Sequence, residues 1–474
     1  MKRVSQLLFC VWPGRVALCR LALFIGATAA VRGQSLPNLS VNLNVNGKAH
    51  IVWQTPTVSS ILQESSSLNS TGTWPASALN IITNGCTCQV LAPATNAVRF
   101  FRLASTNPPA VGIYLGQPTR LLQTHELGMT MLPDMHIAPM LQTNKSYRLW
   151  ITGHFEENTY EGATGLLLTT NFTNFVSGYS PGTTNVVPVF VPSYRGPTAT
   201  NTMPGGYTNF DADYAGANLV WTATNGTDLL MLYHGESKAF GTNAPNAIEP
   251  SWSVVGLARS RDQGITWSNR QVIISGSDTK PNTNPPVAQL YGAVEPGAII
   301  ASNYIYAYYA YFSATPATNP PNPVIQVARS ALTNDGAPGT WMIYSNGLFS
   351  QLALGGSGSS LLPATCGCTR TAQPWPVYST YLNAYVLVFI ATEGWFFSTS
   401  TDLVNWSSPI QFYTAPSPEF LLGSETDENV IFVTPGNADQ VIGQSGIVLY
   451  SHTSAWKGIP DELWSRPFTF SKNP

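Results

Sequence analysis

Short runs in which apolar and polar residues alternate recur along residues 111–474, and Asn, Gly, Pro or Ser bounds each run. One repeat unit contains the runs Leu229–His234 and Ser253–Ser260, followed by a tight turn and Trp267. A period of two residues predicts strands, and turn residues between them predict hairpins. Because no long amphipathic helical period stands out, the pattern predicts an all-β protein.

This unit occurs five times, and each copy leads from a first strand to an aromatic-rich strand and then to a hairpin ending in Trp or Phe. The first strands are Met135–Leu141, Ala217–Thr222, Gly292–Ala301, Trp375–Tyr378 and Glu428–Thr434. The period is about 50 to 80 residues with insertions, which is typical of propellers and related arrays. The repeats therefore predict a five-bladed β-propeller over residues 111–474.

The turn that closes the second unit has the spacing Ser260-x-Asp262-x-Gly264-x-Thr266-Trp267. The Asp262 carboxylate can accept N–H groups of the turn, and Gly264 can take a positive φ. Trp267 can then fill an apolar seam. This spacing matches the Asp-box of propeller blades. Because most Asp-boxes are structural turns far from any active site, the motif indicates the fold and not the chemistry.

The segment before residue 111 predicts a targeting peptide and a separate module. Basic residues precede the apolar run Leu21–Ala30, and small residues follow, so residues 1–34 are expected to be a cleaved signal peptide. Short strands with Asn, Gly and Pro turns in residues 35–104 predict a small β-sandwich of the immunoglobulin or fibronectin type. Residues 105–110 form the linker. A secreted protein, extracellular or periplasmic, with no membrane span after cleavage is expected.

The composition argues against two classes of binding partner. The net charge is −2 and only 10% of residues are charged, which argues against a nucleic-acid groove and a polybasic membrane surface. The cysteines outside the signal peptide are Cys86, Cys88, Cys366 and Cys368. Two C-x-C pairs allow a zinc site, but an exported chain favours disulfides, and pairing between the two motifs is the open alternative.

Three stretches of the chain resemble the five-bladed propeller glycoside hydrolases, the group of arabinanases, β-xylosidases and arabinofuranosidases in glycoside hydrolase family 43. These stretches are the hairpin Ser400–Trp406, the strand Ser146–Gly153 and the segment Glu295–Tyr309. The resemblance covers roughly residues 111–474. It implies one acidic residue at the inner end of each of the first three blades.

Carried over by position, the resemblance implies that Asp134 is a general base, Asp213 an acid that tunes the pKa of its neighbour, and Glu295 the general acid. An inverting glycosidase needs such residues, because one carboxylic acid protonates the leaving oxygen while a carboxylate activates water. Asp211 is the alternative to Asp213. Asp134 could instead be a turn residue or helix cap, and Asp211 or Asp213 a solvated loop acid. Glu295 has apolar neighbours, so we expect a desolvated carboxyl there.

Other side chains near the predicted inner strands are candidates for substrate binding. They are His136, Asp211, His234, Glu236 and Trp375, and Glu236 is also the reserve acid. Each has a structural alternative, since single histidines are often satisfied core residues and most propeller aromatics fill seams between blades. No metal ligand is assigned and no cofactor is required. Ca²⁺ is considered only at the axis, near His136, or at Glu425–Glu428, which is otherwise an exposed loop.

The sequence thus predicts a secreted, monomeric glycoside hydrolase that acts on a carbohydrate by an inverting mechanism. The first alternative is a non-catalytic propeller that binds glycans or partners at the cell surface. The second is a sialidase-type propeller, which needs an arginine cluster and a Tyr–Glu nucleophile pair. Arginine is scarce in this chain, so the sialidase ranks last.

Overall fold

The computed structural model describes most of residues 111–472, together with short pieces of residues 5–105. The gaps in the first range are residue 124 and residues 156–161, 180–184, 194–209, 239–250, 279–289, 314–322, 363–369, 415–424 and 455–458. The pieces before it are residues 5–6, 40–43, 49–54, 60–65, 77, 79, 81–84, 87–92 and 100–105. Within these residues the chain is built from strands, with two single 3₁₀ turns and no α-helix. The all-β prediction is confirmed.

The described pieces before residue 106 form two antiparallel sheets. The first has the order β2-β3-β6-β5 and the second β1-β7-β4. Their bounds are β1 (Ser5–Gln6), β2 (Ser40–Leu43), β3 (Ala49–Gln54), β4 (Ser60–Ser65), β5 (Ile82–Asn84), β6 (Thr87–Ala92) and β7 (Phe100–Ser105). The two-residue strand β1 lies inside the predicted signal peptide, and both that peptide and the domain boundaries stay predictions. Cys86, Cys366 and Cys368 lie outside the described residues, so the cysteine pairing is also untested.

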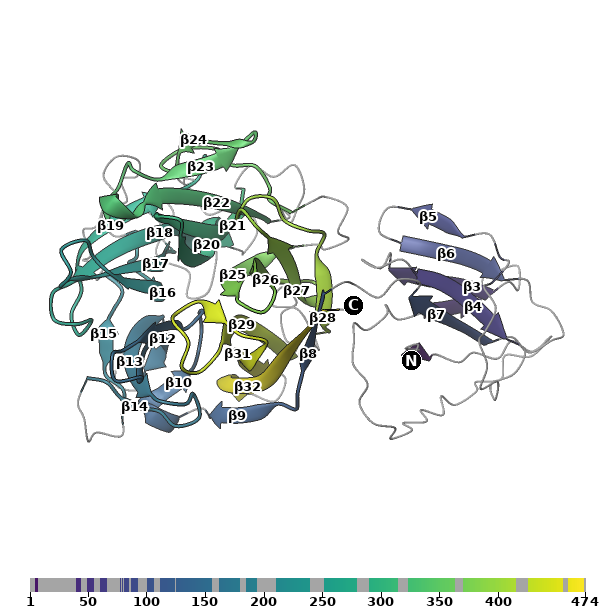
Figure 1. Cartoon of the computed structure of the whole chain (residues 1–474), viewed down its shortest axis with the longest axis horizontal. Coiled ribbons are helices and arrows are strands. Elements are labelled where there is room, and N and C mark those ends of the chain that lie inside the picture. Colours follow the sequence, from purple (N-terminus) through teal and green to yellow (C-terminus); the bar gives the residue numbers. More distant parts are fainter. Residues whose placement is uncertain are drawn as a thin grey trace.

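From residue 129 onward the chain forms five successive groups of antiparallel strands, which Figure 1 shows around a common centre. Group one contains β10 (Met129–Met131), β11 (Ala138–Leu141), β12 (Tyr147–Phe155), β13 (Ala163–Thr169), β14 (Val176–Ser177) and β15 (Pro188–Phe190). Group two contains β16 (Tyr214–Thr222), β17 (Leu229–Ser237), β18 (Ser251–Ser260) and β19 (Ser268–Ile274). Group three contains β20 (Leu290–Ala301), β21 (Tyr304–Phe312), β22 (Val324–Ala331), β23 (Met342–Ser345) and β24 (Leu348–Leu352).

Group four contains β25 (Ala372–Ser379), β26 (Ala384–Ala391), β27 (Gly394–Ser400) and β28 (Ile410–Tyr413). Group five contains β29 (Glu425–Val433), β31 (Ser445–Ser454), β32 (Ile459–Lys472), β8 (Val111–Leu115) and β9 (Thr119–Leu122). Parallel pairing of β18 with β20 joins groups two and three into one nine-stranded sheet. The propeller class is therefore observed, while the number of blades stays a prediction.

Group five is completed by the start of the propeller segment. Strand β8 pairs antiparallel with the last strand, β32, with Lys472 opposite Val111 and Phe470 opposite Ile113. Strand β9 pairs with β32 further along. The first and last strands of the ring thus belong to the same sheet, which closes the ring by backbone hydrogen bonds.

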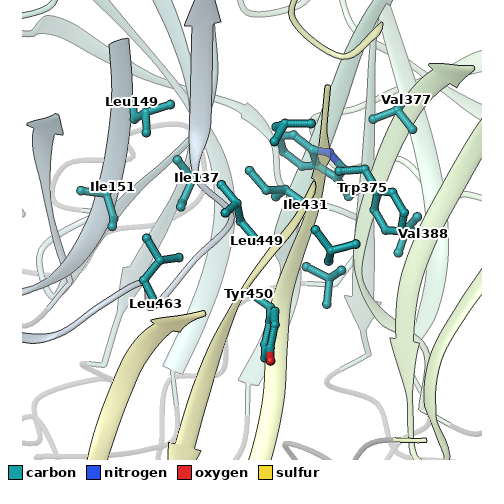
Figure 2. Close-up of a cluster of buried hydrophobic side chains, with 14 of the residues drawn as sticks. Ile137, Leu149, Ile151, Trp375, Val377, Val388, Ile431, Leu449, Tyr450 and Leu463 are labelled. Carbon is teal, nitrogen blue, oxygen red and sulfur yellow. The ribbon is translucent and has the colours of Figure 1, made fainter. Parts of the chain in front are cut away.

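The largest apolar cluster contains residues of groups one, three, four and five (Figure 2). Ile137 and Leu149 come from group one, Trp375 from group four, and Ile431 and Leu449 from group five, and all are buried. Strands β12 and β26 contribute alternate residues to this core, whereas β29 and β31 contribute the consecutive residues 430–433 and 448–450. This packing holds the first strands of the groups near the centre.

The connection between β29 and β31 touches three other groups. The Asp439 carboxylate accepts a hydrogen bond from the N–H of Leu141 at 2.6 Å. The N–H of Tyr378 donates to the carbonyl of Gln440, and the Gln440 amide donates to the carbonyl of Ala298. A short strand in it, β30 (Val441–Ile442), pairs in parallel with β25. One loop therefore links groups one, three and four.

The turn after β18 has the contacts expected from its spacing. The Asp262 carboxylate accepts the N–H of Thr266 at 2.8 Å and its hydroxyl at 2.6 Å. Gly264 has a φ of 85°, and the Trp267 ring packs edge-on against Trp150 of group one. The turn therefore joins two neighbouring groups. No helix among the described residues is long and apolar enough to cross a membrane.

Candidate active site

Glu295 lies at an irregular point of β20. The register with β21 shifts between Val294 and Gly297, and Glu295 takes a positive φ of 45°. A bulge with a left-handed residue that is not glycine is strained, and such strain is concentrated at functional sites. The side chain is 8% exposed. Its backbone N–H donates to Nδ1 of His234 at 2.9 Å, which fixes β20 against β17 of group two.

That hydrogen bond also determines the tautomer of His234. Because Nδ1 accepts from the Glu295 N–H, the proton of the neutral ring lies on Nε2, which is 2.7 Å from Oε1 of Glu236. Burial alone would raise the pKa of Glu236, but the hydrogen bond from His234 and the positive charge of Lys238 outweigh it, and the pKa lies below its usual value. Glu236 is therefore kept as a carboxylate.

Tyr214 is linked to acidic residues of three groups. It lies opposite Glu236 in the β16–β17 ladder, and its hydroxyl donates to the backbone carbonyl of Asp134 at 2.5 Å. Burial raises the pKa of Tyr214 well above its usual value, and the negative charges of Asp134, Glu236 and Glu295 raise it further. Three acidic residues, from groups one, two and three, thus act on the pKa of one hydroxyl.

Asp134 is the most accessible of the three carboxylates. It follows the bond between Leu132 and Pro133, which is cis, and its N–H donates to the carbonyl of Thr152 at 2.9 Å. The side chain is 30% exposed, and Nε2 of His154 lies 3.8 Å from its Oδ2. A carboxylate that is held by its backbone but still reaches solvent can activate a water molecule.

Groups four and five add residues that the sequence did not predict. Nε2 of Gln373 donates to Oε1 of Glu295 at 3.2 Å and to Oε2 of Glu428 at 3.5 Å. The N–H of Asn429 donates to Oε1 of Gln373 at 2.6 Å, and the Asn429 amide reaches the carbonyl of Pro133 at 3.5 Å. Hydrogen bonds therefore run from His234 through all five groups. One sequence feature could have pointed to Gln373: it precedes a proline, as Glu295 does.

The other two predicted acids of group two lie in different surroundings. Asp211 is 1% exposed, and its oxygens accept from Ser193 at 2.5 Å, from Tyr233 at 2.9 Å and from Arg270 at 2.8 Å. These partners occupy the carboxylate, so a substrate-binding role for Asp211 is not supported. Asp213 accepts from the N–H of Lys238 at 2.6 Å. The carboxylate of this group whose charge raises the pKa of Tyr214, together with those of Asp134 and Glu295, is Glu236.

Two predicted binding residues are buried at the centre. His136 is fully buried, and burial lowers its pKa from 6.5 to about 3, partly offset by the backbone of Pro296 and Gln373. Its ring lies 5.2 Å from the Trp375 ring, which is 1% exposed within the apolar core of Figure 2. Trp375 therefore offers no face to a sugar ring, and a platform role is not supported.

The described residues contain no group of three or more His, Cys, Asp or Glu side chains suited to hold a metal ion. The acids at the start of β29 are divided between two environments. Glu428 contacts Gln373, whereas Asp427 accepts from Tyr413 at 2.5 Å and lies 2.7 Å from Nδ1 of His452. A rim Ca²⁺ site at Glu425–Glu428 stays a prediction, because nothing is described of the Glu425 side chain. An axial Ca²⁺ stays untested.

No family model and no curated protein matches the chain. Solved structures do match it. One is the catalytic domain of the Coprinopsis cinerea GH62 alpha-L-arabinofuranosidase, with 11% identity over 76% of this chain and 98% of that chain and a TM-score of 0.44. Another is Zg3597, a family 117 glycoside hydrolase of Zobellia galactanivorans, with 10% identity over 76% and 91% and a TM-score of 0.46.

These two similar structures are an arabinofuranosidase and a glycoside hydrolase. The chain is also similar to an N-acetylgalactosamine deacetylase from F. plautii, with 12% identity over 77% of this chain and 96% of that chain and a TM-score of 0.40. Glycoside hydrolases are thus among the similar structures, as the sequence predicted. At identities of 10–12%, the reaction has to be inferred from the side chains of this chain.

Proposed function

We propose that this protein is a glycoside hydrolase that cleaves oligosaccharides or polysaccharides by an inverting mechanism. The observation that carries the proposal is the chain of contacts that connects Asp134, Glu236 and Glu295. The Tyr214 hydroxyl donates to the backbone of Asp134, Tyr214 lies opposite Glu236, and His234 contacts both the Glu236 carboxylate and the N–H of Glu295. Hydrolysis of a glycosidic bond requires a proton donor and a carboxylate on opposite faces of the sugar ring. The carboxyls of Asp134, Glu236 and Glu295, from three strand groups, are the candidates for these two roles.

In this mechanism Asp134 is the general base and Glu295 the general acid. Asp134 is open to solvent and removes a proton from the attacking water, while the buried Glu295 protonates the leaving oxygen. Glu236 stays ionised through its bond with His234. Its fixed negative charge disfavours a second charge on Glu295 and so favours the protonated form that a general acid needs.

The sialidase alternative does not fit the buried tyrosine of this site. A sialidase-type reaction needs a tyrosine activated as a nucleophile by a neighbouring glutamate. Tyr214 does lie beside Glu236, but burial and three negative charges raise its pKa, which makes the phenolate harder to form. The hydroxyl instead donates to the Asp134 carbonyl and holds the loop of the base.

The test is hydrolysis of arabinan, xylan, galactan, fructan and sialosides by residues 35–474, the expected secreted chain. We expect turnover of a neutral glycan, and a loss of about 10²–10⁴-fold in Glu295→Gln and Asp134→Asn. Glu126→Gln removes an exposed carboxylate and should change nothing. Proton NMR of the first product should show the inverted anomer. Glycan binding without turnover would instead favour the non-catalytic propeller.

A further inference from the structure

Gln373 occupies the same irregular backbone position in group four that Glu295 occupies in group three. The register of β25 with β26 shifts between Ala372 and Trp375, and Gln373 has a positive φ of 51°. Its side chain is 2% exposed. A strained, buried amide is costly unless its polar atoms have partners, so its contacts are informative.

The orientation of this amide is determined by the backbone. The N–H of Asn429 lies 2.6 Å from Oε1 of Gln373, and only an oxygen can accept there. Turning the amide over would place its NH₂ group against that N–H. The NH₂ group must therefore face the two carboxyls, Oε1 of Glu295 at 3.2 Å and Oε2 of Glu428 at 3.5 Å.

This contact makes the two oxygens of Glu295 different. Because Gln373 donates to Oε1, that oxygen must accept, and a protonated Glu295 carries its proton on Oε2. On the opposite side of the residue, the bond from its N–H to His234 fixes the backbone. The carboxyl is thus held at both ends, and proton transfer requires such fixed geometry.

We propose that Gln373 is a positioning residue of the reaction, which directs Oε2 of Glu295 toward the leaving oxygen and keeps Glu428 in the same site. This inference rests on the proposed glycosidase function. Gln373 does not donate a proton to the substrate. It acts through Glu295, so its removal should affect mainly those substrates whose leaving group needs protonation.

The experiment compares kcat/KM for a series of aryl glycosides, from phenyl to 2,4-dinitrophenyl, of the sugar that the wild type cleaves. In Gln373→Leu we expect a loss of about 10²-fold for the phenyl glycoside and less than about threefold for the dinitrophenyl glycoside, which leaves without a proton. The matched control is Gln326→Leu. Gln326 is also a buried amide, but it contacts Tyr309 and the Gly358 carbonyl. Any loss of kcat/KM in Gln326→Leu should be the same for all leaving groups.

A second readout keeps the contact testable without turnover. The carboxyl ¹³C resonance of Glu295, assigned by its absence in Glu295→Gln, should titrate at least about half a pH unit higher in Gln373→Leu. Equal losses for all leaving groups, or an unchanged titration in a folded variant, would overturn the proposal. If the wild type cleaves no glycoside, both the proposed function and the positioning role of Gln373 are wrong. A shifted titration in that case would show only that Gln373 contacts Glu295.

Discussion

His136 is a histidine without exposure to solvent at the centre of the ring. Burial lowers its pKa from 6.5 to about 3, and the side chain packs against Trp375. Below pH 6.5 the unfolded chain binds a proton at this residue, while the folded chain does not until about pH 3. Acid therefore favours the unfolded state through this one residue.

His136→Gln should reduce the loss of stability in acid. The stabilising contribution of neutral His136 is present above pH 6.5 and is lost as the pH falls toward 3, by at most about 5 kcal/mol. Urea unfolding at pH 4 and pH 7 checks this, with Glu126→Gln as the exposed control. The absolute stability of the variant can fall at both pH values. A pH dependence identical to that of the wild type would contradict the buried neutral histidine.

The sequence indicated which acidic residues are candidates for the site, but not where their side chains point. Asp134 and Glu295 were predicted, and the charges of both raise the pKa of Tyr214. Alternation along β20 could not show where Glu295 points, because the residue lies in a bulge that interrupts the alternation. Asp211 could not be assigned from local sequence, since its partner Arg270 is far along the chain. The catalytic roles themselves stay predictions.

At the scale of elements, the loop between β29 and β31 fastens group five to its neighbours. Asp439 in this loop accepts the N–H of Leu141, yet burial raises its pKa from 3.8 to about 6. A raised pKa means that the folded chain binds a proton more tightly than the unfolded chain. This loop is therefore stabilised by mild acid, which is opposite in sign to the effect of His136.

Asp439→Asn should remove this second pH dependence. An amide oxygen can still accept the Leu141 N–H. The variant lacks the buried negative charge, which lowers the stability of the wild type by at most about 3 kcal/mol as the pH rises from 3.8 to above 6. We expect the variant to be at least as stable as the wild type at pH 7 and no more stable at pH 4. The midpoints of thermal unfolding at both values check this. A variant that is less stable at pH 7 by several kcal/mol would contradict it.

Turns and strands were predictable at this scale because their signals are local. The contacts of Asp262 followed from the spacing of its turn. Strands overlap all five predicted first strands, although the first begins at Ala138 and not at Met135. The pairing of β30 with β25 was not predictable. It joins a two-residue strand to one that lies more than 60 residues earlier, and no periodic pattern extends over such a strand.

At the scale of the whole molecule, the ring depends on the pairing of β8 with β32. Ile113 and Phe470 lie opposite each other in this ladder, and both belong to the largest apolar cluster. The repeats predicted a closed array, but they did not predict which strands would close it, because β8 lies outside the five repeat units. Composition and repeat length carry no information about that register.

Phe470→Ala should destabilise the whole ring and not only its last strand. A buried phenylalanine replaced by alanine costs about 3–5 kcal/mol, because a cavity adds to the lost burial. Leu348→Ala, on an exposed position of β24, should cost less than about 0.5 kcal/mol. Urea unfolding followed by tryptophan fluorescence measures both. If both variants lose similarly little unfolding free energy, the closing strand contributes little to the stability of the ring.

The same closure has a consequence for the order of events during synthesis. The hydroxyls of Tyr114 and Ser471 are 3.1 Å apart in the folded chain, although 357 positions separate them in the sequence. A ribosome that has made group four has already produced β8, but the partner of that strand does not yet exist. Such distant contacts slow folding. The edge of this early strand must therefore wait for its partner until β32 has left the exit tunnel.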